Sequence, residues 1–417
     1  MKRMEWFIIL LFTAVLGYAP VATAQTEASC EACHRAHTPG IVSDWKMSAH
    51  AKSGVSCSDC HGAEHSSSED TEKAKLATWK TCEGCHAEQV KQFQAGKHAL
   101  AWAAANAMPT THWQPMALLE GQKGCTGCHK IGLKSEEEIR ELRKKGTRYG
   151  SASCDSCHTR HLFSKKEAME PQACRTCHMG IDHPQWEMYE SSKHGVRYAL
   201  SQNGVLSNEV SAPKCQTCHL PEGTHENDTA WGFLAVRLPM PEDDKWAKDR
   251  ATILKGLGVL DPKGEPTERL EVVKKAKVAK LTQEAWQKER DEMIGICSKC
   301  HAENLARKEL QKGDAMIREA DRMMAEAIRI VASLYKEGLI EKPEHYAHAY
   351  PDLLAFHDAP TVVENKLFIM FLKHRMRTFQ GAFHMNPDYT LWYGWSEMVR
   401  DLQEIRRLAA EMRKKTS

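Results

Sequence analysis

The sequence predicts a mainly α-helical protein with few strands, and three observations support this class. Residues that favour helices, such as Ala, Glu, Lys, Leu and Met, are common, whereas aromatic residues make up only 7% of the 417-residue chain. All 16 cysteines belong to one repeated motif. Residues 297–417 carry apolar side chains at helical spacing. Charge is nearly balanced, with 57 Lys and Arg against 55 Asp and Glu, which argues against a partner such as nucleic acid.

The repeated motif is Cys-x-x-Cys-His, and it occurs eight times. Two thiols at this spacing form thioether bonds to the two vinyl groups of one haem, and the adjoining imidazole binds the iron. The sequence therefore predicts eight covalently bound haem c groups in a multihaem cytochrome core. The motifs are Cys30, Cys33 and His34; Cys57, Cys60 and His61; Cys82, Cys85 and His86; Cys125, Cys128 and His129; Cys154, Cys157 and His158; Cys174, Cys177 and His178; Cys215, Cys218 and His219; and Cys297, Cys300 and His301.

Three other uses of cysteine explain the pattern less well. Disulfides suit an exported chain but do not require a histidine after each second cysteine. Structural zinc sites use paired Cys-x-x-Cys units without a trailing histidine in every unit. Thioredoxin-like redox motifs occur singly in a βαβ context, which this sequence lacks. Eight complete motifs with no cysteine left over favour haem.

Residues 1–24 have the pattern of a signal peptide. Lys2 and Arg3 precede an apolar run from Trp6 to Leu16, and Ala22-Thr23-Ala24 forms a small-x-small cleavage site. The alternative is a retained membrane anchor, although the run is shorter than the roughly 20 residues of a spanning helix. We therefore expect an exported, soluble, periplasmic protein.

The remaining chain divides into three parts. Residues 25–225 form a haem-rich core with the first seven motifs, and residues 226–296 form a haem-free insert whose charges are expected to coat a solvated face. Residues 297–417 carry the eighth motif and a long C-terminal helical bundle. Its first helix has a buried stripe, a second runs from Pro360 to about Gly381, and a third spans about Trp392 to Met412. The stripe consists of Leu310, Ile317, Ala320, Met324, Ala327, Val331 and Leu334.

Fourteen of the 22 histidines lie outside the motifs, and some of these are candidates for the second axial ligand of an iron. His37 and His65 are either ligands or exposed side chains. His345, His348, His374 and His384 have no motif near them in sequence and are expected to be structural. The stronger candidates lie close to motifs or beside small or basic residues: His50, His98, His112, His161, His194, His225 and His357.

Eight motifs, a haem-free insert and long C-terminal helices resemble the octahaem hydroxylamine oxidoreductases. The segments that carry the resemblance run from Cys154 to His161, from Cys177 to Trp186, and from Trp231 to Leu234. It extends over nearly the whole mature chain. It implies that the fourth motif (Cys125, Cys128 and His129) holds the catalytic haem.

The second half is also similar to the pentahaem ammonia-forming nitrite reductases. The shared features are His183-Pro184-Gln185, His194-Gly195 and the stretch from Phe356 to Pro360. This similarity implies that His183 is catalytic and that His194 and His357 are haem ligands. Those enzymes carry Lys in place of His at the catalytic haem, and this chain has no such motif.

The two resemblances imply an oxidoreductase for small nitrogen compounds. Asp182 and His183 would exchange protons with a substrate nitrogen on the open iron, although a distal ligand with a hydrogen-bonded neighbour remains an alternative. In oxidative members a tyrosine from a neighbouring subunit is linked to the catalytic haem, and Tyr389 or Tyr393 would take that role, with Tyr389 preferred. The alternative for either tyrosine is an ordinary interface aromatic.

We therefore expect oxidation of hydroxylamine, or of a related compound such as hydrazine, in a homo-oligomer that the family makes a trimer. Electrons would pass to a cytochrome or a quinone-linked partner. Two alternatives remain: the same scaffold reducing nitrite or hydroxylamine toward ammonia, and a pure electron-transfer conduit.

Overall fold

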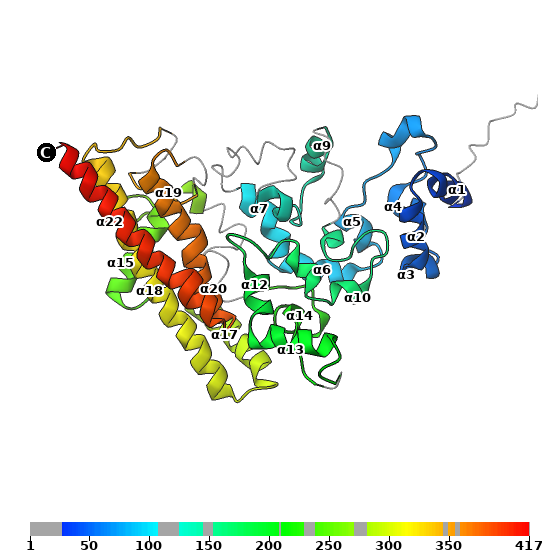
Figure 1. The fold of residues 1–417 in the computed structure, drawn as a ribbon. Helices are drawn as coiled ribbons and strands as arrows, with labels where there is room; N and C mark the ends of the chain where they lie inside the picture. Colours follow the sequence, from blue (N-terminus) through cyan, green and yellow to red (C-terminus); the bar gives the residue numbers. More distant parts are fainter. Residues whose placement is uncertain are drawn as a thin grey trace, which may run out of the picture.

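The fold is known from a computed structural model that describes residues 27–106, 125–144, 153–207, 210–228, 238–270, 282–344, 349–354 and 359–416. Within these ranges the chain forms helices joined by loops, and the extended pairing is limited to an isolated bridge between Leu260 and Pro266. The predicted mainly α class is confirmed. Figure 1 shows an elongated molecule with short helices at one end and a bundle of long helices at the other.

The motif-bearing part of the chain consists of helices of 3 to 11 residues. They are α1 (Glu27–His37), α2 (Pro39–Met47), α3 (Ala49–Lys52), α4 (Cys57–His61), η1 (Ser68–Lys73), α5 (Trp79–Glu83), α6 (Ala87–Ala95), η2 (His98–Leu100), α7 (Ala101–Asn106), α8 (Cys125–His129), α9 (Glu136–Lys144), η5 (Cys154–Ser156), α10 (Lys165–Ala168), α11 (Gln172–Arg175), α12 (Gln185–Glu190), α13 (Lys193–Gln202), α14 (Cys215–His219) and η6 (Pro221–Gly223).

Several of these helices are the motifs themselves. Helices α4, α8 and α14 each span the five residues from the first cysteine to the histidine. Positions i, i+3 and i+4 of a helical turn lie on one face, so in α4 and α14 this turn directs both sulfurs and the imidazole to the same side. In α4 the turn begins at Ser56, whose hydroxyl accepts the N–H of Asp59 at 3.3 Å.

The C-terminal part is a bundle of longer helices. Figure 1 shows α15, α18, α20 and α22 running side by side. The bundle consists of α15 (Asp244–Gly256), α17 (Gln283–Ser298), α18 (Glu303–Lys336), α19 (Val362–Ile369), the π-helical turn η8 (Met370–Arg375), α20 (Met376–Phe383), α21 (Pro387–Thr390), the π-helical turn η9 (Leu391–Trp395) and α22 (Ser396–Thr416).

Helix α18 is the centre of this bundle. All seven residues of its predicted apolar stripe are buried, and they pack in one core with side chains from α15, α20 and α22. Burying each large apolar side chain contributes about 1.5–3 kcal/mol, which explains why a 34-residue helix forms here. The predicted helical bundle is confirmed.

The other helices shift from their predicted ends. The second begins at Val362 because Thr361, not Pro360, is its N-cap, with its hydroxyl accepting the N–H of Glu364 at 3.4 Å. It continues through η8 to the end of α20. The third starts with η9 and extends to the end of α22.

The charges of the insert were expected to be solvated, and this is wrong for part of it. Asp249 and Arg250 on α15 are buried, as is Arg290 on α17. These helices pack inside the bundle, where Arg250 pairs with Asp321 at 2.7 Å. The opposite charge of Asp321, on another helix, therefore offsets the cost of burying Arg250.

Within the described ranges, no helix combines the length and the hydropathy that a membrane span needs. The predicted signal peptide, residues 1–24, lies outside the described residues.

Candidate haem sites and catalytic centre

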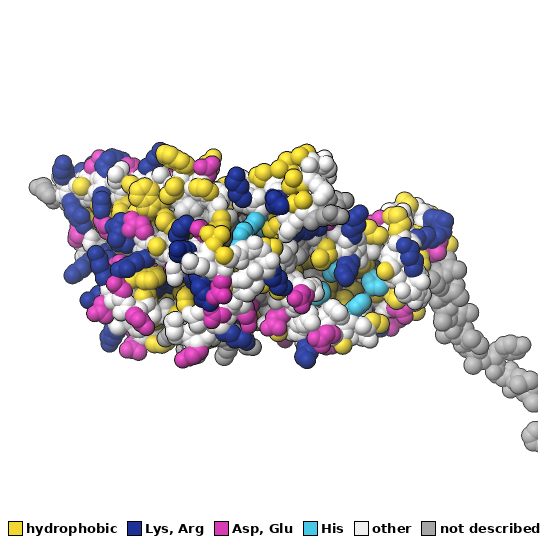
Figure 2. Space-filling model, turned by 90° about the horizontal axis from the view of Figure 1, so that it is seen from below, with side chains coloured by type: hydrophobic (Ala, Val, Ile, Leu, Met, Phe, Trp, Pro, Cys, Tyr) yellow, Lys and Arg dark blue, Asp and Glu magenta, His cyan; other side chains and the backbone are white. Residues whose placement is uncertain are grey.

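The motif region encloses one large cavity of about 2270 Å³. Ordinary small-ligand sites hold roughly 300–1,000 Å³, so this space is several times larger than one such site requires. Histidines from seven of the eight motifs line it, together with mostly apolar neighbours. Figure 2 shows histidine side chains within openings on one face of the molecule.

Seven motif histidines each face one histidine from elsewhere in the chain, with ring centroids 6.0–6.5 Å apart. The pairs are His34 with His65, His61 with His161, His86 with His50, His158 with His225, His178 with His98, His219 with His384, and His301 with His194.

These separations fit one iron between two imidazoles. A metal–imidazole bond is about 2 Å long and each ring centroid lies about 1 Å beyond the nitrogen, so two imidazoles on one iron have centroids about 6 Å apart. Direct ring packing would not require the same spacing in seven separate pairs. The residues present therefore suit haem c with two histidine ligands.

The hydrogen bonds of two imidazole rings leave their Nε2 atoms available to bind iron. His61 Nδ1 donates to the carbonyl of Lys75, and His384 Nδ1 donates to the carbonyl of Gln380, at 2.9 and 2.8 Å. A carbonyl oxygen only accepts, so these rings carry their proton on Nδ1 and leave Nε2 unprotonated. The backbone thus fixes both tautomer and ring orientation.

Burial keeps the central imidazoles neutral. It lowers the pKa of His178 to about 3 and the pKa values of His98 and His219 to about 4. Each of these rings is therefore uncharged at neutral pH. A neutral imidazole is the form that binds iron.

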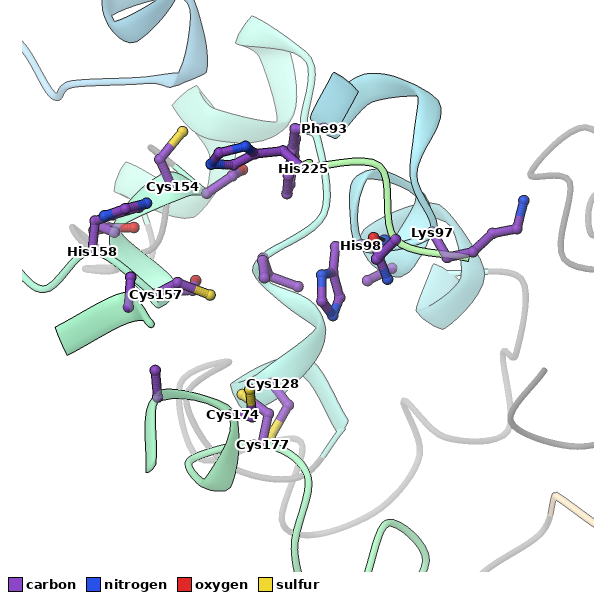
Figure 3. Close-up of a pocket in the computed structure, with 18 of the residues that line it drawn as sticks. Phe93, Lys97, His98, Cys128, Cys154, Cys157, His158, Cys174, Cys177 and His225 are labelled. Carbon is purple, nitrogen blue, oxygen red and sulfur yellow. Dashed lines mark hydrogen bonds between the residues drawn. The ribbon is translucent and has the colours of Figure 1, made fainter. Parts of the chain in front are cut away.

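Cysteines from different motifs meet in pairs, as Figure 3 shows for Cys128 and Cys177. In the haem-loaded protein these sulfurs would be thioethers, and their proximity would place neighbouring haems close to each other. The fourth motif adjoins the sixth, which also adjoins the seventh. The contacting pairs are Cys82 with Cys154, Cys128 with Cys177, and Cys174 with Cys215.

Beside the fourth motif lie Asp182 and His183. The ring of His183 is 6.4 Å from that of His129 and 6.3 Å from that of His178. His178 already faces His98, whereas His129 has His183 as its neighbour. The separation of His183 from His129 lies within the range of the seven pairs, and His183 differs from their members in lying equally close to a second motif histidine.

The two residues also contact each other. His183 Nδ1 lies 3.1 Å from Asp182 Oδ1. Burial works against the charged carboxyl, but the hydrogen bond and the charge of His183 outweigh it, so the pKa of Asp182 is lowered. A carboxylate that orients an imidazole is an arrangement suited to proton transfer.

The structure places the other predicted residues as follows. His50, His98, His161, His194 and His225 each face a motif histidine, as described above. His112, His357 and the side chain of Cys125 lie outside the described residues. Tyr389 packs on Tyr393 with ring centroids 5.1 Å apart, and the guanidinium of Arg377 lies 6.0 Å from its ring.

Two of the facing histidines were not among the stronger candidates. His65 lies four residues after His61, and its Nδ1 is held by Asp70 Oδ1 at 2.9 Å, so an acidic residue nearby was the available signal. His384 was expected to be structural, yet it faces His219 across 165 residues of sequence. Nothing local to His384 in the sequence indicates this contact.

The chain matches the family described as "Seven times multi-haem cytochrome CxxCH" over residues 26–237 and 268–345, more than half of its length. A probable nitrite reductase-hydroxylamine oxidoreductase fusion protein of Kuenenia stuttgartiensis is 26% identical, with the match spanning 92% of this chain and 51% of that protein. The chain thus spans about half the length of this curated relative.

Two solved structures have a similar fold. A Kuenenia stuttgartiensis reducing HAO-like protein complex has a TM-score of 0.68 at 24% identity, covering 94% of this chain and 86% of that chain. A hypothetical multiheme protein has a TM-score of 0.62 at 19% identity, covering 94% and 96%.

Proposed function

Because the chain belongs to the family of multihaem cytochromes with repeated Cys-x-x-Cys-His motifs, we propose that it is an octahaem oxidoreductase for a small nitrogen compound. The reaction takes place beside the fourth motif, at His129, Asp182 and His183. The observation that carries the proposal is the position of His183, which stands next to His129 with Asp182 on its Nδ1.

The proposed complement is eight haem c groups, one per motif. The seven dedicated histidine pairs support seven six-coordinate irons that only transfer electrons. When bound, the fourth haem supplies an iron that takes up the substrate nitrogen and exchanges electrons through the others. A conduit with eight equivalent sites would not need one imidazole that lies equally close to two motif histidines.

The residues around this centre handle protons. Asp182 holds the Nδ1–H of His183, so Nε2 of His183 is the atom that gives or takes a proton at the substrate. The peptide N–H of Gln185 donates to the carbonyl of His183 at 2.8 Å, which fixes the backbone of the catalytic pair. Helix α12 then anchors the pair against α20 through a bond between Gln185 and Gln380 at 3.1 Å.

We assign the reductive direction, in which nitrite or hydroxylamine gains electrons toward ammonia. The name of one structural relative supports it, since that relative is a reducing HAO-like complex, and the curated relative combines a nitrite reductase with a hydroxylamine oxidoreductase. Electrons then enter from an exported cytochrome or a quinone-linked donor. The signal-peptide pattern of residues 1–24 supports export to the periplasm.

Hydroxylamine oxidation is the second candidate function. One observation favours it: Tyr389 lies next to Leu391, Trp392 and Tyr393, whose side chains are strongly exposed. An exposed aromatic cluster of this kind suits contact with another subunit. That contact is what the family's tyrosine link requires.

The test is carbon monoxide binding followed by turnover in both directions. The reduced protein should bind one carbon monoxide per chain, seen as a single change in the visible spectrum. Nitrite and hydroxylamine should oxidise the reduced protein, and oxidised protein with hydroxylamine should stay oxidised. If the reduced protein binds no carbon monoxide, a pure electron-transfer conduit is the function that remains. Rapid reduction by hydroxylamine would establish the oxidative function instead.

A further inference from the structure

A small network on the far side of His129 involves residues that the proposed chemistry does not use. It joins the start of α7 to the loop between α8 and α9. His129 Nδ1 donates to the carbonyl of Ala101 at 2.9 Å. The position of this one carbonyl therefore sets the direction of the imidazole and the strength of its hydrogen bond.

The backbone around Ala101 is locked to the loop that follows the motif. Leu133 donates its peptide N–H to the carbonyl of Ala99 at 2.8 Å. A Cβ at Gly132 would lie 2.0 Å from the backbone nitrogen of Trp102, so the two stretches of backbone touch and only glycine is possible there. The two segments therefore cannot slide past each other.

The side chain of Trp102 also contributes to the contact between α7 and the loop that follows the motif. Its indole N–H donates to Glu138 Oε1 at 2.8 Å, and the ammonium of Lys134 lies 5.1 Å from the ring centroid. Lys134 in turn donates to the carbonyl of Gly132 at 2.9 Å. A cation and a carboxylate thus hold the indole of Trp102, the residue that follows Ala101.

Glu138 is itself fixed by the first turn of α9. Its second oxygen accepts the N–H of Ser135 at 2.7 Å, and the Ser135 hydroxyl accepts the N–H of Glu138 at 3.2 Å. This reciprocal pair is a capping box. One carboxylate therefore starts helix α9 and also restrains Trp102.

The same segment reaches a second motif. His98 precedes Ala101 by three residues and faces His178 of the sixth motif. The peptide that orients the ligand of the fourth iron is therefore continuous with a ligand of the sixth. These two motifs also meet through Cys128 and Cys177.

We infer that Trp102 and Glu138 are positioning residues for the catalytic haem, which act by holding the Ala101 carbonyl against His129 Nδ1. A well-placed acceptor makes the imidazole a stronger electron donor to iron, and a loosened one makes it weaker. The pair therefore tunes the iron opposite Asp182 and His183 without touching substrate. This role rests on the proposed function only in taking the fourth haem as the open one.

The test compares Trp102→Phe and Glu138→Gln with Glu137→Gln in the haem-loaded protein. Phe keeps a six-membered aromatic ring but loses the indole N–H. Gln keeps an oxygen that can accept from the indole. Glu137 is exposed on the same turn of α9, so it controls for a change of charge at this helix. The readouts are the iron–histidine stretching band of the reduced open haem and its reduction potential.

Trp102→Phe should lower the frequency of that band and favour the reduced state of the open haem by roughly threefold to tenfold. Glu138→Gln should lie between Trp102→Phe and the wild type, and Glu137→Gln should match the wild type. If Trp102→Phe lowers only thermal stability and leaves band and potential unchanged, the positioning role is overturned. These readouts need no substrate, so they test the positioning role even in a protein that fails to turn over nitrogen compounds.

Discussion

At the residue scale, the proposed reaction divides one task between Asp182 and His183. The carboxylate accepts from Nδ1 and has a lowered pKa, so it stays ionised at neutral pH and never competes for the substrate's proton. The imidazole presents its other nitrogen. The carboxylate would orient the imidazole, and the imidazole would exchange the proton. A substitution of either residue is therefore expected to have a different effect on turnover.

Replacing His183 with Ala removes the proton donor and should reduce turnover of nitrite or hydroxylamine by about 10²–10⁴-fold. Asp182→Asn keeps the shape but offers an amide in place of the charged acceptor, so its loss should be smaller and should change the pH profile. Steady-state kinetics with a chemical reductant measure both.

The matched control is His37→Ala, because His37 is an exposed histidine on α1 far along the chain from the centre. It should leave turnover unchanged. Carbon monoxide binding should survive in all three variants. If His183→Ala turns over substrate at the wild-type rate, the assignment of the catalytic pair is wrong.

His384 offers a second residue-scale prediction. It faces His219 at 6.5 Å, so His384→Ala should open the seventh iron. The variant should show an added high-spin signal in its electron paramagnetic resonance spectrum and bind a second carbon monoxide. His374→Ala is the control, since His374 is also buried but pairs with Asp401 at 2.5 Å. An unchanged spectrum in His384→Ala would refute the ligand role.

What could be predicted at this scale follows from how far each contact lies along the chain. The motif residues needed only a five-residue pattern. His50 and His98 were selected because motifs lie near them in the sequence, although they face His86 and His178, which are 36 and 80 residues away. His384 could not be found, because its contact with the seventh motif spans 165 residues of sequence. Its local sequence carries no trace of that contact.

At the scale of elements, the bundle is organised around a buried charge. Asp321 on α18 is fully buried between Arg250 of α15 and Arg375 of η8, at 2.7 and 2.8 Å. The indole of Trp246 donates to the same carboxylate at 2.9 Å. Two elements, α15 and η8, thus converge on one side chain of α18, which fixes how they pack against it.

Asp321→Asn should destabilise the protein by about 3–5 kcal/mol, because it leaves two buried guanidinium groups without their counter-charge. Glu326→Gln is the matched control on the same helix, since Glu326 pairs with Arg406 near the surface and should contribute about 0–1 kcal/mol. The midpoint of urea unfolding, followed by circular dichroism of the haem-loaded protein, compares the two. Equal midpoints would show that the buried cluster contributes nothing particular.

The pH dependence of this cluster has a defined sign. Burial disfavours the charged carboxyl, but Arg250 and Arg375 prevail and lower the pKa of Asp321 below 3.8. Its stabilisation is therefore present above the unfolded-state pKa and is lost as pH falls through the lower folded-state pKa. The difference in urea midpoint between wild type and Asp321→Asn should accordingly shrink in strong acid.

The elements themselves were predicted to different degrees. Helix α18 follows from apolar residues at helical spacing, and its buried stripe appeared as expected. The prediction that the charges of the insert are solvated was wrong for Asp249 and Arg250, because only the packing of α15 on α18 buries them. The π-helical turns η8 and η9 were not predicted, because one additional residue per turn leaves no signature in an otherwise helical sequence.

At the scale of the whole molecule, the cysteine contacts give the motifs a connected order. The fourth motif reaches the others through Cys128 and Cys177, and the sixth continues to the seventh through Cys174 and Cys215. Among the described contacts, the fourth motif meets the others through the sixth. In the proposed function, electrons that arrive from the seventh motif would therefore pass the sixth before they reach the fourth. This placement suits chemistry that needs several electrons in succession.

In the proposed function, the direction of electron flow would depend on a contact with another copy of the chain. Leu391, Trp392 and Tyr393 are 47, 66 and 52% exposed, and Tyr389 packs beside them. The cluster suits a subunit interface, and a covalent link from it to the neighbour's haem would favour removal of electrons. In the reductive assignment the cluster makes contact without a link. Denatured protein should then run as monomers in mass spectrometry, each with eight haems.

Tyr389→Phe distinguishes the two outcomes. In the reductive assignment, the variant should keep its oligomeric state in native mass spectrometry and its activity with nitrite, because the ring still packs on Tyr393. Tyr393→Phe serves as the matched control in the same cluster. A wild-type oligomer that survives denaturation and is lost only in Tyr389→Phe would show a covalent tyrosine. It would reverse the assigned direction in favour of hydroxylamine oxidation, while the site at His129, Asp182 and His183 would remain the same.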